Sequence, residues 1–211
     1  MEEKIVYFER PGRTNTEETL RLVLDRALAR GITKVVLAST VGDTARLASE
    51  RFAGTGIKLI VVPHQYGFRQ GPQRFPQELI SELEQQGHCV HFGTMLFHTN
   101  DLFGTAIPTV MATLLRTFCQ GMKVCVEIVL MATDGGCVAL GERVIVVSGT
   151  GRGADTAVIA IAASSRNLNE LHLTEIICKP MQTRSWPATS QVPRPEELKS
   201  PLPSSVPPMP A

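Results

Sequence analysis

The spacing of apolar residues along the chain switches repeatedly between the pattern of a strand and that of a helix. Short runs that are apolar almost throughout, or rich in β-branched residues, predict strands at 5–8, 34–39, 58–63, 89–92 and 143–149. Apolar residues that recur every three or four positions predict helices between Asn15 and Gly31 and at 43–52 and 77–86. This alternation predicts a three-layer α/β/α sandwich around a largely parallel sheet.

The second half of the chain continues the pattern, with two ambiguous places. We expect helices at 105–119 and 122–135, separated near Gly121 because glycine is a poor residue for a helix interior. Residues 171–179 alternate like a half-exposed strand. The β-branched content of 156–162 predicts a strand, but the alanines of this segment also fit a helix, and both interpretations remain open.

Five polar side chains stand alone in the apolar segment that carries these two helices, namely Arg116, Gln120, Lys123, Glu127 and Asp134. On a helix their spacing places them within an arc of about 60°. Such a narrow stripe is either the exposed side of the segment or the wall of a polar site. Its mixture of guanidinium, amide, ammonium and carboxylate groups favours the site, with Arg116, Gln120, Lys123 and Glu127 as contacts for a polar ligand.

Ligands of parallel sheets collect where strands end at their carboxyl edge, and that rule selects four loops. These are 39–44, 64–75, 93–104 and 150–155. In the first loop, Ser39, Thr40, Gly42 and Thr44 combine hydroxyl groups, a permissive glycine and the free N–H groups of a helix start, which suits a phosphate. Asp43 argues against this prediction because its carboxylate would repel an anion, and an ordinary helix cap has the same composition.

The loop after the strand at 143–149 has the most distinctive composition. Its glycines permit close approach of a ligand, and Arg152 supplies a planar donor fork for phosphate or carboxylate. The predicted contacts are Thr150, Gly151, Arg152, Gly153, Asp155 and Thr156. A plain glycine turn is the alternative, and the loop lacks the Gly-Lys-Ser/Thr ending of a P-loop. A dinucleotide-binding G-x-G-x-x-A match, with Glu175 as the ribose-binding acid, requires a helix at 156–163.

The loop 64–75 offers His64 and Tyr66 for stacking on a flat heterocycle or for acid–base chemistry. Together with the polar groups above, it makes His64, Glu127 and Asp155 the candidate catalytic residues. No spacing of His, Asp and Glu predicts a metal site. The five cysteines form no C-x-x-C pair, so we expect small core thiols in a reducing compartment.

Composition narrows the classes of function. The chain has 211 residues, 43% of them hydrophobic, and a net charge of +1, so we expect one core and neither nucleic acid nor a membrane as partner. The N-terminal residues lack the basic start and apolar core of a signal peptide, which predicts a cytoplasmic protein. We expect the domain at 1–181 and, because eight prolines follow Met181, a disordered Pro-rich tail at 182–211.

Several motifs resemble a family of standalone proteins related to the C-terminal α/β domain of pyruvate kinase. The resemblance covers nearly all of residues 5–181. Its main stretches are Tyr7-Phe8-Glu9-Arg10-Pro11-Gly12, Tyr66-Gly67-Phe68-Arg69, Lys123-Val124-Cys125-Val126-Glu127, Gly149-Thr150-Gly151-Arg152-Gly153-Ala154-Asp155-Thr156-Ala157 and Glu175-Ile176-Ile177-Cys178-Lys179-Pro180. The chain departs from the family at Met95, where a His is expected, and at Pro63 and Gln65, which flank His64.

The resemblance implies a pyruvate kinase C-terminal domain-like fold with a mostly parallel, five-stranded sheet between helices. It implies that the loop 39–44 matches one that holds phosphates of a sugar bisphosphate effector, and that flavin mononucleotide (FMN) is a candidate cofactor. It does not imply pyruvate kinase activity, because the catalytic TIM barrel has no room in this chain. Subunit contacts of the related kinase domain imply a possible homo-oligomer.

The leading hypothesis is therefore a small-molecule-binding α/β domain for a phosphorylated ligand, with FMN first and a sugar phosphate second. One alternative is an enzyme, either flavin-dependent or phosphate-ester-transforming. Another alternative is an oligomerising regulatory module. The sequence does not rank the enzyme above the binding protein.

Overall fold

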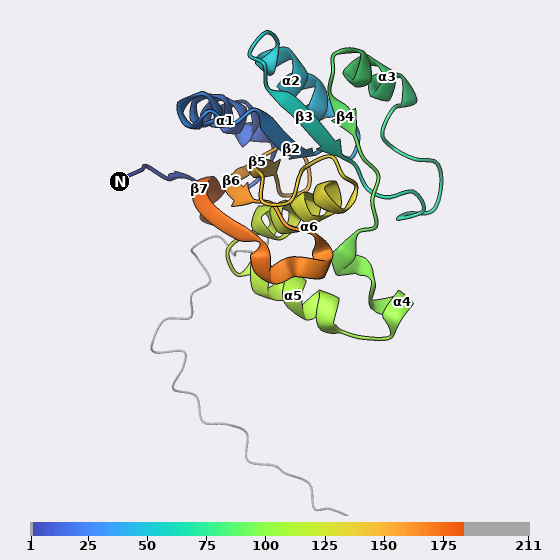
Figure 1. Ribbon diagram of the computed structural model, residues 1–211. Helices are drawn as coiled ribbons and strands as arrows, with labels where there is room; N and C mark the ends of the chain where they lie inside the picture. Colours follow the sequence, from blue (N-terminus) through green and yellow to red (C-terminus); the bar gives the residue numbers. More distant parts are fainter. Residues whose placement is uncertain (1, 184–211) are drawn as a thin grey trace, which may run out of the picture.

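A single mixed sheet of seven strands, in the order β1-β7-β6-β5-β2-β3-β4, forms the centre of the protein. The computed structural model describes residues 2–183 (Figure 1). The strands are β1 (Val6–Phe8), β2 (Lys34–Ala38), β3 (Lys58–Val62), β4 (Cys89–Val90), β5 (Arg143–Ser148), β6 (Thr156–Ile161) and β7 (His172–Pro180). The pairings are parallel except that β6 is antiparallel to both β5 and β7. Six strands therefore run in one direction and β6 runs in the other.

Helices cover both faces of this sheet and make three layers (Figure 1). One face packs against α1 (Thr16–Arg30), α2 (Asp43–Phe52) and α3 (Gln77–Gln85), and the other against α6 (Gln120–Asp134). The helix α5 (Ile107–Arg116) packs on α6 rather than on the sheet. The remaining short helices are η1 (Arg13–Asn15), η2 (Leu96–His98), α4 (Asn100–Phe103) and η3 (Ser165–Glu170).

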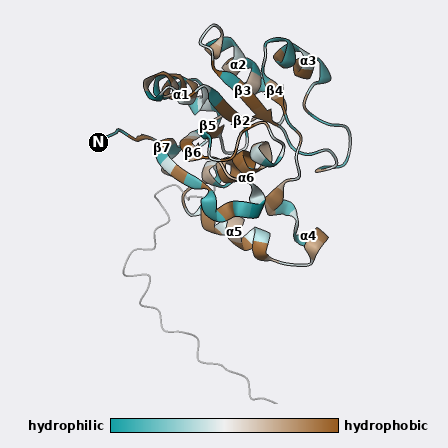
Figure 2. Cartoon of the chain, viewed as in Figure 1, coloured by the Kyte–Doolittle hydropathy of each residue, from teal (hydrophilic) through white to brown (hydrophobic). Residues whose placement is uncertain are grey.

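The central strands are apolar throughout because both of their faces are covered. In β2, Val35 and Leu37 pack into the core under α1 and α2, whereas Val36 packs towards α6. These three side chains have no exposed surface. Figure 2 shows the same strands as predominantly hydrophobic. The alternation of side chains along a strand thus supplies both cores at once.

The segments that were predicted as strands are strands, including β1 and β4 at the two edges, where short segments of three and two residues pair with β7 and β3. The resemblance implied a five-stranded sheet, whereas the sheet has seven strands. Residues 156–161 form β6 and not a helix, so the dinucleotide-binding interpretation, which required a helix there, is also wrong.

The two helices expected at 105–119 and 122–135 are present as α5 and α6, but the break between them does not lie at Gly121. Gly121 is buried in the first turn of α6, and the break falls earlier, between α5 and Cys119. A Cβ atom at position 121 would collide with the side chain of Thr156 at the start of β6. The glycine therefore allows α6 to approach the sheet closely, and the cost of glycine in a helix is offset by packing.

The carboxylate of Asp155 joins segments that are far apart in the sequence. Its Oδ2 accepts hydrogen bonds from the N–H of Gly12 (2.9 Å) and of Thr150 (3.0 Å), and its Oδ1 accepts one from the hydroxyl of Thr156 (2.8 Å). The residue is completely buried. It therefore connects the β1–α1 segment to the glycine-rich loop between β5 and β6.

No helix within residues 2–183 is long and apolar enough to cross a lipid bilayer. The predicted disordered tail at 182–211 lies outside the described residues except for its first two positions.

Replacing Asp155 by Ala is expected to lower the free energy of unfolding by about 1 to 3 kcal/mol or more, because the buried N–H groups of Gly12 and Thr150 would lose their acceptor. Urea unfolding followed by circular dichroism measures this change. The matched control is Asp101→Ala at an exposed position, where we expect a change within about 0.5 kcal/mol. Equal stability of the two variants would show that the Asp155 carboxylate does not hold these loops.

Candidate functional site

A cavity of about 380 Å³ opens at the carboxyl edge of the sheet, where β2, β3 and β5 end. The ends of β2 and β3 form its floor, through Ala38 and Val62. The starts of α2 and α6, the loop after β3, the loop after β4 and the glycine-rich loop after β5 form its walls. Its position agrees with the general rule for ligand sites in α/β sheets.

The outer wall of the cavity is rich in groups that attract anions. Arg69, Arg74 and Arg152 reach it from two different loops, and none of them forms an ion pair within residues 2–183. All three are exposed, so solvent screens their charges. Asp43 lines the same wall and opposes them with one carboxylate.

The first turn of α2 lies beside these arginines. Ser39, Thr40 and Thr44 line the cavity there, and the Oγ of Ser39 accepts a hydrogen bond from the N–H of Ala45 (3.3 Å). The helix has ten residues, and its N-terminal N–H groups carry partial positive charge. The outer wall thus combines a helix N-terminus with three guanidinium groups.

The inner wall contains a buried ion pair from α6. The Nζ of Lys123 donates to the Oε2 of Glu127 over 2.5 Å, and each side chain is only 2% exposed. The other carboxylate oxygen, Oε1, accepts a hydrogen bond from the N–H of Phe97 (2.8 Å). Lys123 also lies 3.1 Å from the Nε2 of His98. Burial lowers the pKa of Lys123, and the adjacent Glu127 partly opposes that effect.

Aromatic rings connect the inner wall to the loop after β3. The ring of Phe68 meets His64 and His98 edge-on, at centroid distances of 4.7 and 5.0 Å. Burial lowers the pKa of both imidazoles, reinforced by Arg69 at His64 and by Lys123 at His98. Both shifts favour the neutral form of the ring. The rest of the lining is mainly apolar and includes Val62, Met95, Val124, Ile128 and Met131.

One hydrogen bond joins the loop after β3 to the loop after β4, and another lies within the loop after β3. The Oε1 of Gln65 accepts from the N–H of Met95 (2.6 Å), and Gln73 donates through Nε2 to the carbonyl of His64 (3.0 Å). Met95, at the position where the resemblance led us to expect a His, is buried at the cavity wall. The cavity therefore has an apolar thioether at this place, and its two imidazoles come from His64 and His98.

Ten of the sequence-predicted ligand contacts line the cavity. They are Ser39, Thr40, Thr44, His64, Gln120, Lys123, Glu127, Gly151, Arg152 and Gly153. The other six do not line it, and they are Gly42, Tyr66, Arg116, Thr150, Asp155 and Thr156. The structure thus brings together two of the three candidate catalytic residues, His64 and Glu127, and leaves the third, Asp155, in the interior.

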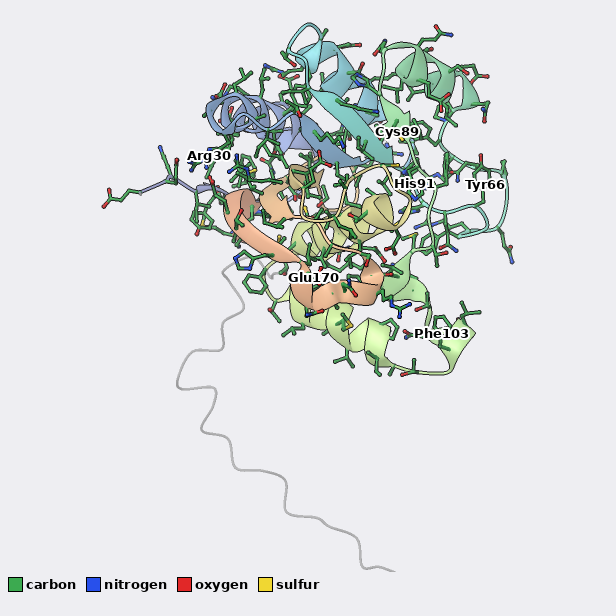
Figure 3. The ribbon with its side chains drawn as sticks, in the orientation of Figure 1. Arg30, Tyr66, Cys89, His91, Phe103 and Glu170 are labelled. Atoms are coloured by element: carbon green, nitrogen blue, oxygen red, sulfur yellow. The ribbon has the colours of Figure 1, made fainter. Side chains whose placement is uncertain are left out.

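The predicted residues outside the lining have identifiable surroundings. Tyr66 lies on the outer edge of its loop, 60% exposed and tilted against Phe92 (Figure 3). Arg116 donates through Nε to the Oε1 of Gln120 (2.8 Å) and so orients a side chain that does line the cavity. Of the polar stripe, Asp134 lies at the far end of α6, where it accepts from the N–H of Ser165.

Sequence reasoning missed several lining residues as ligand contacts. Arg69, Arg74 and Phe68 come from the loop after β3, and His98 and Met95 come from the loop after β4. Phe68 and Arg69 belong to the motif Tyr66-Gly67-Phe68-Arg69 of the resemblance, and Met95 was noted as a departure from it, but none of the three was predicted as a ligand contact. For Arg74 and His98 the sequence signal was membership of loops at the carboxyl edge. Glu175, the possible ribose-binding acid, is instead paired with Arg26 and Arg30 of α1.

Among residues 2–183, no three or more His, Cys, Asp or Glu side chains gather as a metal site would require. The five cysteines are free thiols. Cys119, Cys125 and Cys178 are buried as expected for core residues, whereas Cys89 and Cys137 are partly exposed, with their sulfur atoms 3.4 Å apart.

The sequence matches no protein-family model. The relation to standalone pyruvate kinase C-terminal-like proteins is therefore a proposal that rests on the shared motifs, and the function must be argued from the cavity.

Proposed function

We propose that this domain binds a phosphorylated small molecule in the cavity, with FMN as the first candidate and a sugar phosphate as the second. The observation that carries the proposal is the division of one cavity into a cationic outer wall and an apolar, aromatic inner wall. Phosphorylated ligands with a flat ring have the same two-part character. The volume of about 380 Å³ lies within the usual range of small-molecule sites.

The outer wall suits the phosphate. The N-terminus of α2 and the guanidinium of Arg152 can donate hydrogen bonds, while Arg69 and Arg74 add positive charge. Gly151 has a φ of 84°, a backbone conformation that is strained for residues with a Cβ atom. Only glycine therefore readily brings the backbone of this loop to the cavity. Three guanidinium groups outnumber the single carboxylate of Asp43 in this wall.

The inner wall suits a planar ring that carries carbonyl groups. Phe68, Ile128 and Met131 offer apolar contacts, and the ammonium group of Lys123 and the amide group of Gln120 can donate to carbonyl oxygens. A flavin ring has these acceptors, and bound flavin would add redox chemistry. A sugar phosphate would use the same phosphate wall but would leave much of the apolar surface uncovered.

A second candidate function is an enzyme that acts on such a ligand. The observation that favours it is the continuous contact from Glu127 through Lys123 to His98, next to a second imidazole at His64. These groups can take up or release a proton at the cavity wall.

Replacing Arg152 by Ala is expected to weaken FMN binding about five- to tenfold, since one charge-assisted hydrogen bond at an exposed position is lost. Binding is measured by quenching of flavin fluorescence. Riboflavin, which has the same ring without the phosphate, should bind the native protein and the variant equally. The matched control is Arg166→Ala in η3, which does not line the cavity.

Two results would contradict this proposal. If FMN and riboflavin bind equally well, the cationic wall does not hold phosphate. If neither flavin binds but a sugar phosphate does, FMN is excluded and the second candidate replaces it.

The affinity for FMN is expected to rise as the pH falls from about 7.5 to 6.5, a range above the second pKa of a phosphate ester, which is about 6. Burial and Arg69 lower the pKa of His64 in the free protein, and a bound phosphate would raise that pKa again. The complex then holds more protons than the free protein, so lower pH favours binding. His64→Gln should flatten the profile, and an unchanged profile in that variant would separate His64 from the phosphate.

A further inference from the structure

A row of large apolar side chains lies exposed on α4, on α5 and just beyond α5. The row consists of Leu102, Phe103, Ile107, Val110, Leu114 and Phe118, which are 53 to 71% exposed. Figure 2 shows hydrophobic residues on both helices, and Figure 3 shows Phe103 at the edge of the molecule. On a helix, Ile107, Val110 and Leu114 fall within an arc of about 60°. We call these six residues the α4–α5 face.

The α4–α5 face has no counterpart elsewhere in the described part of the chain. Scattered exposed apolar residues are ordinary on a protein surface, but six of them gathered on two contacting helices and just beyond one of them indicate an interaction site. The inner side of α5 already has its partner, because Ala112 packs with Val126 and Leu130 of α6. The outer side of α5, by contrast, is exposed within residues 2–183.

We propose that this face is covered by the same face of a second copy of the chain, in a symmetric dimer with α5 packed against α5. A two-fold contact places a surface against itself, so a charged surface would repel its copy. The exposed polar residues of α5 are Thr109 and Thr113, none of its exposed residues is charged, and α4 adds one exposed charge, at Asp101. Apolar side chains and threonines can meet their own copies without repulsion.

The size of the face also fits a dimer. A large apolar side chain exposes on the order of 200 Å² when free, so six that are roughly two thirds exposed present on the order of 800 Å². A stable interface buries about this area on each partner. The face is thus large enough for a specific dimer without any further contact.

Other occupants fit less well. A helix that lies on a membrane surface usually carries Lys and Arg beside its apolar side, whereas threonines flank the apolar side of α5. An extended peptide needs a groove or an open sheet edge, whereas this face is the exposed side of a helix. Ridges of two helices can pack into each other's grooves, which a second copy provides.

In the dimer, the partner's α5 would pack on the outer side of α5, and the inner side of α5 contacts the helix that forms the inner wall of the cavity. The side of α5 that faces inward packs on the part of α6 that carries Lys123 and Glu127. None of the six residues of the α4–α5 face lines the cavity. The proposal is therefore independent of the ligand.

Sedimentation velocity of the full chain tests the proposal directly. We expect a species of twice the chain mass of 23.0 kDa. The double variant Val110→Glu and Leu114→Glu is expected to be monomeric, with a dissociation constant at least about a hundredfold higher, because four buried carboxylates would face each other across the two-fold axis. The matched control is Leu28→Glu on α1, at a side chain 61% exposed, which should remain dimeric.

Folding of each variant is checked by circular dichroism and urea unfolding, which should be nearly unchanged because the replaced side chains are exposed. A native chain that stays monomeric at about 100 μM, where even a micromolar dimer would form, overturns the proposal. A dimer that survives the double variant overturns it too, since its interface then lies elsewhere. A native monomer that sediments with anionic lipid vesicles would assign the face to a membrane instead.

Discussion

The arrangement of the candidate site depends on the buried carboxylate of Asp155. A buried charge costs several kcal/mol unless hydrogen bonds satisfy it, and three donors from two separate segments do so here. One of them, Thr156, also packs against Gly121 in the first turn of α6. The β1–α1 segment, the glycine-rich loop and the start of α6 are therefore fixed together. Two of these three elements, the glycine-rich loop and the start of α6, form walls of the cavity. The shape of the cavity therefore depends on Asp155, although this residue does not line it.

The Lys123–Glu127 pair is a second buried electrostatic feature, but a contribution to stability does not explain it. Apolar residues of similar size would stabilise α6 as well as a buried ion pair does, or better. The pair also lies at the wall of a cavity, in contact with His98, rather than in the middle of the core. Its position is therefore better explained by the need for a polar group facing a ligand than by stability. The same burial that makes the pair costly strengthens its interaction with any bound acceptor.

The sequence predicted those parts of the structure that follow from local periodicity. Buried strands such as β2 and β3 carry apolar residues on both faces, which identifies them without tertiary knowledge. Gly121 was misplaced because its role, close packing on Thr156, depends on a contact 35 residues away. The same difference between local and long-range signals applies to the site. The spacing of Gln120, Lys123 and Glu127 on one helix is local, whereas Arg74 and His98 reach the cavity through loops whose course no periodicity encodes.

The two walls of the cavity should contribute differently to recognition. The arginines of the outer wall are exposed, so water and salt weaken their attraction, and they act on any phosphate alike. Lys123 is only 2% exposed and is already paired with Glu127 and in contact with His98, so a ligand that reaches this wall must match a fixed arrangement of donors and acceptors. A mismatch there would discriminate between ligands of equal charge. On the function proposed above, the outer wall would admit phosphorylated molecules and the inner wall would distinguish among them, which would place specificity on α6 rather than on the glycine-rich loop.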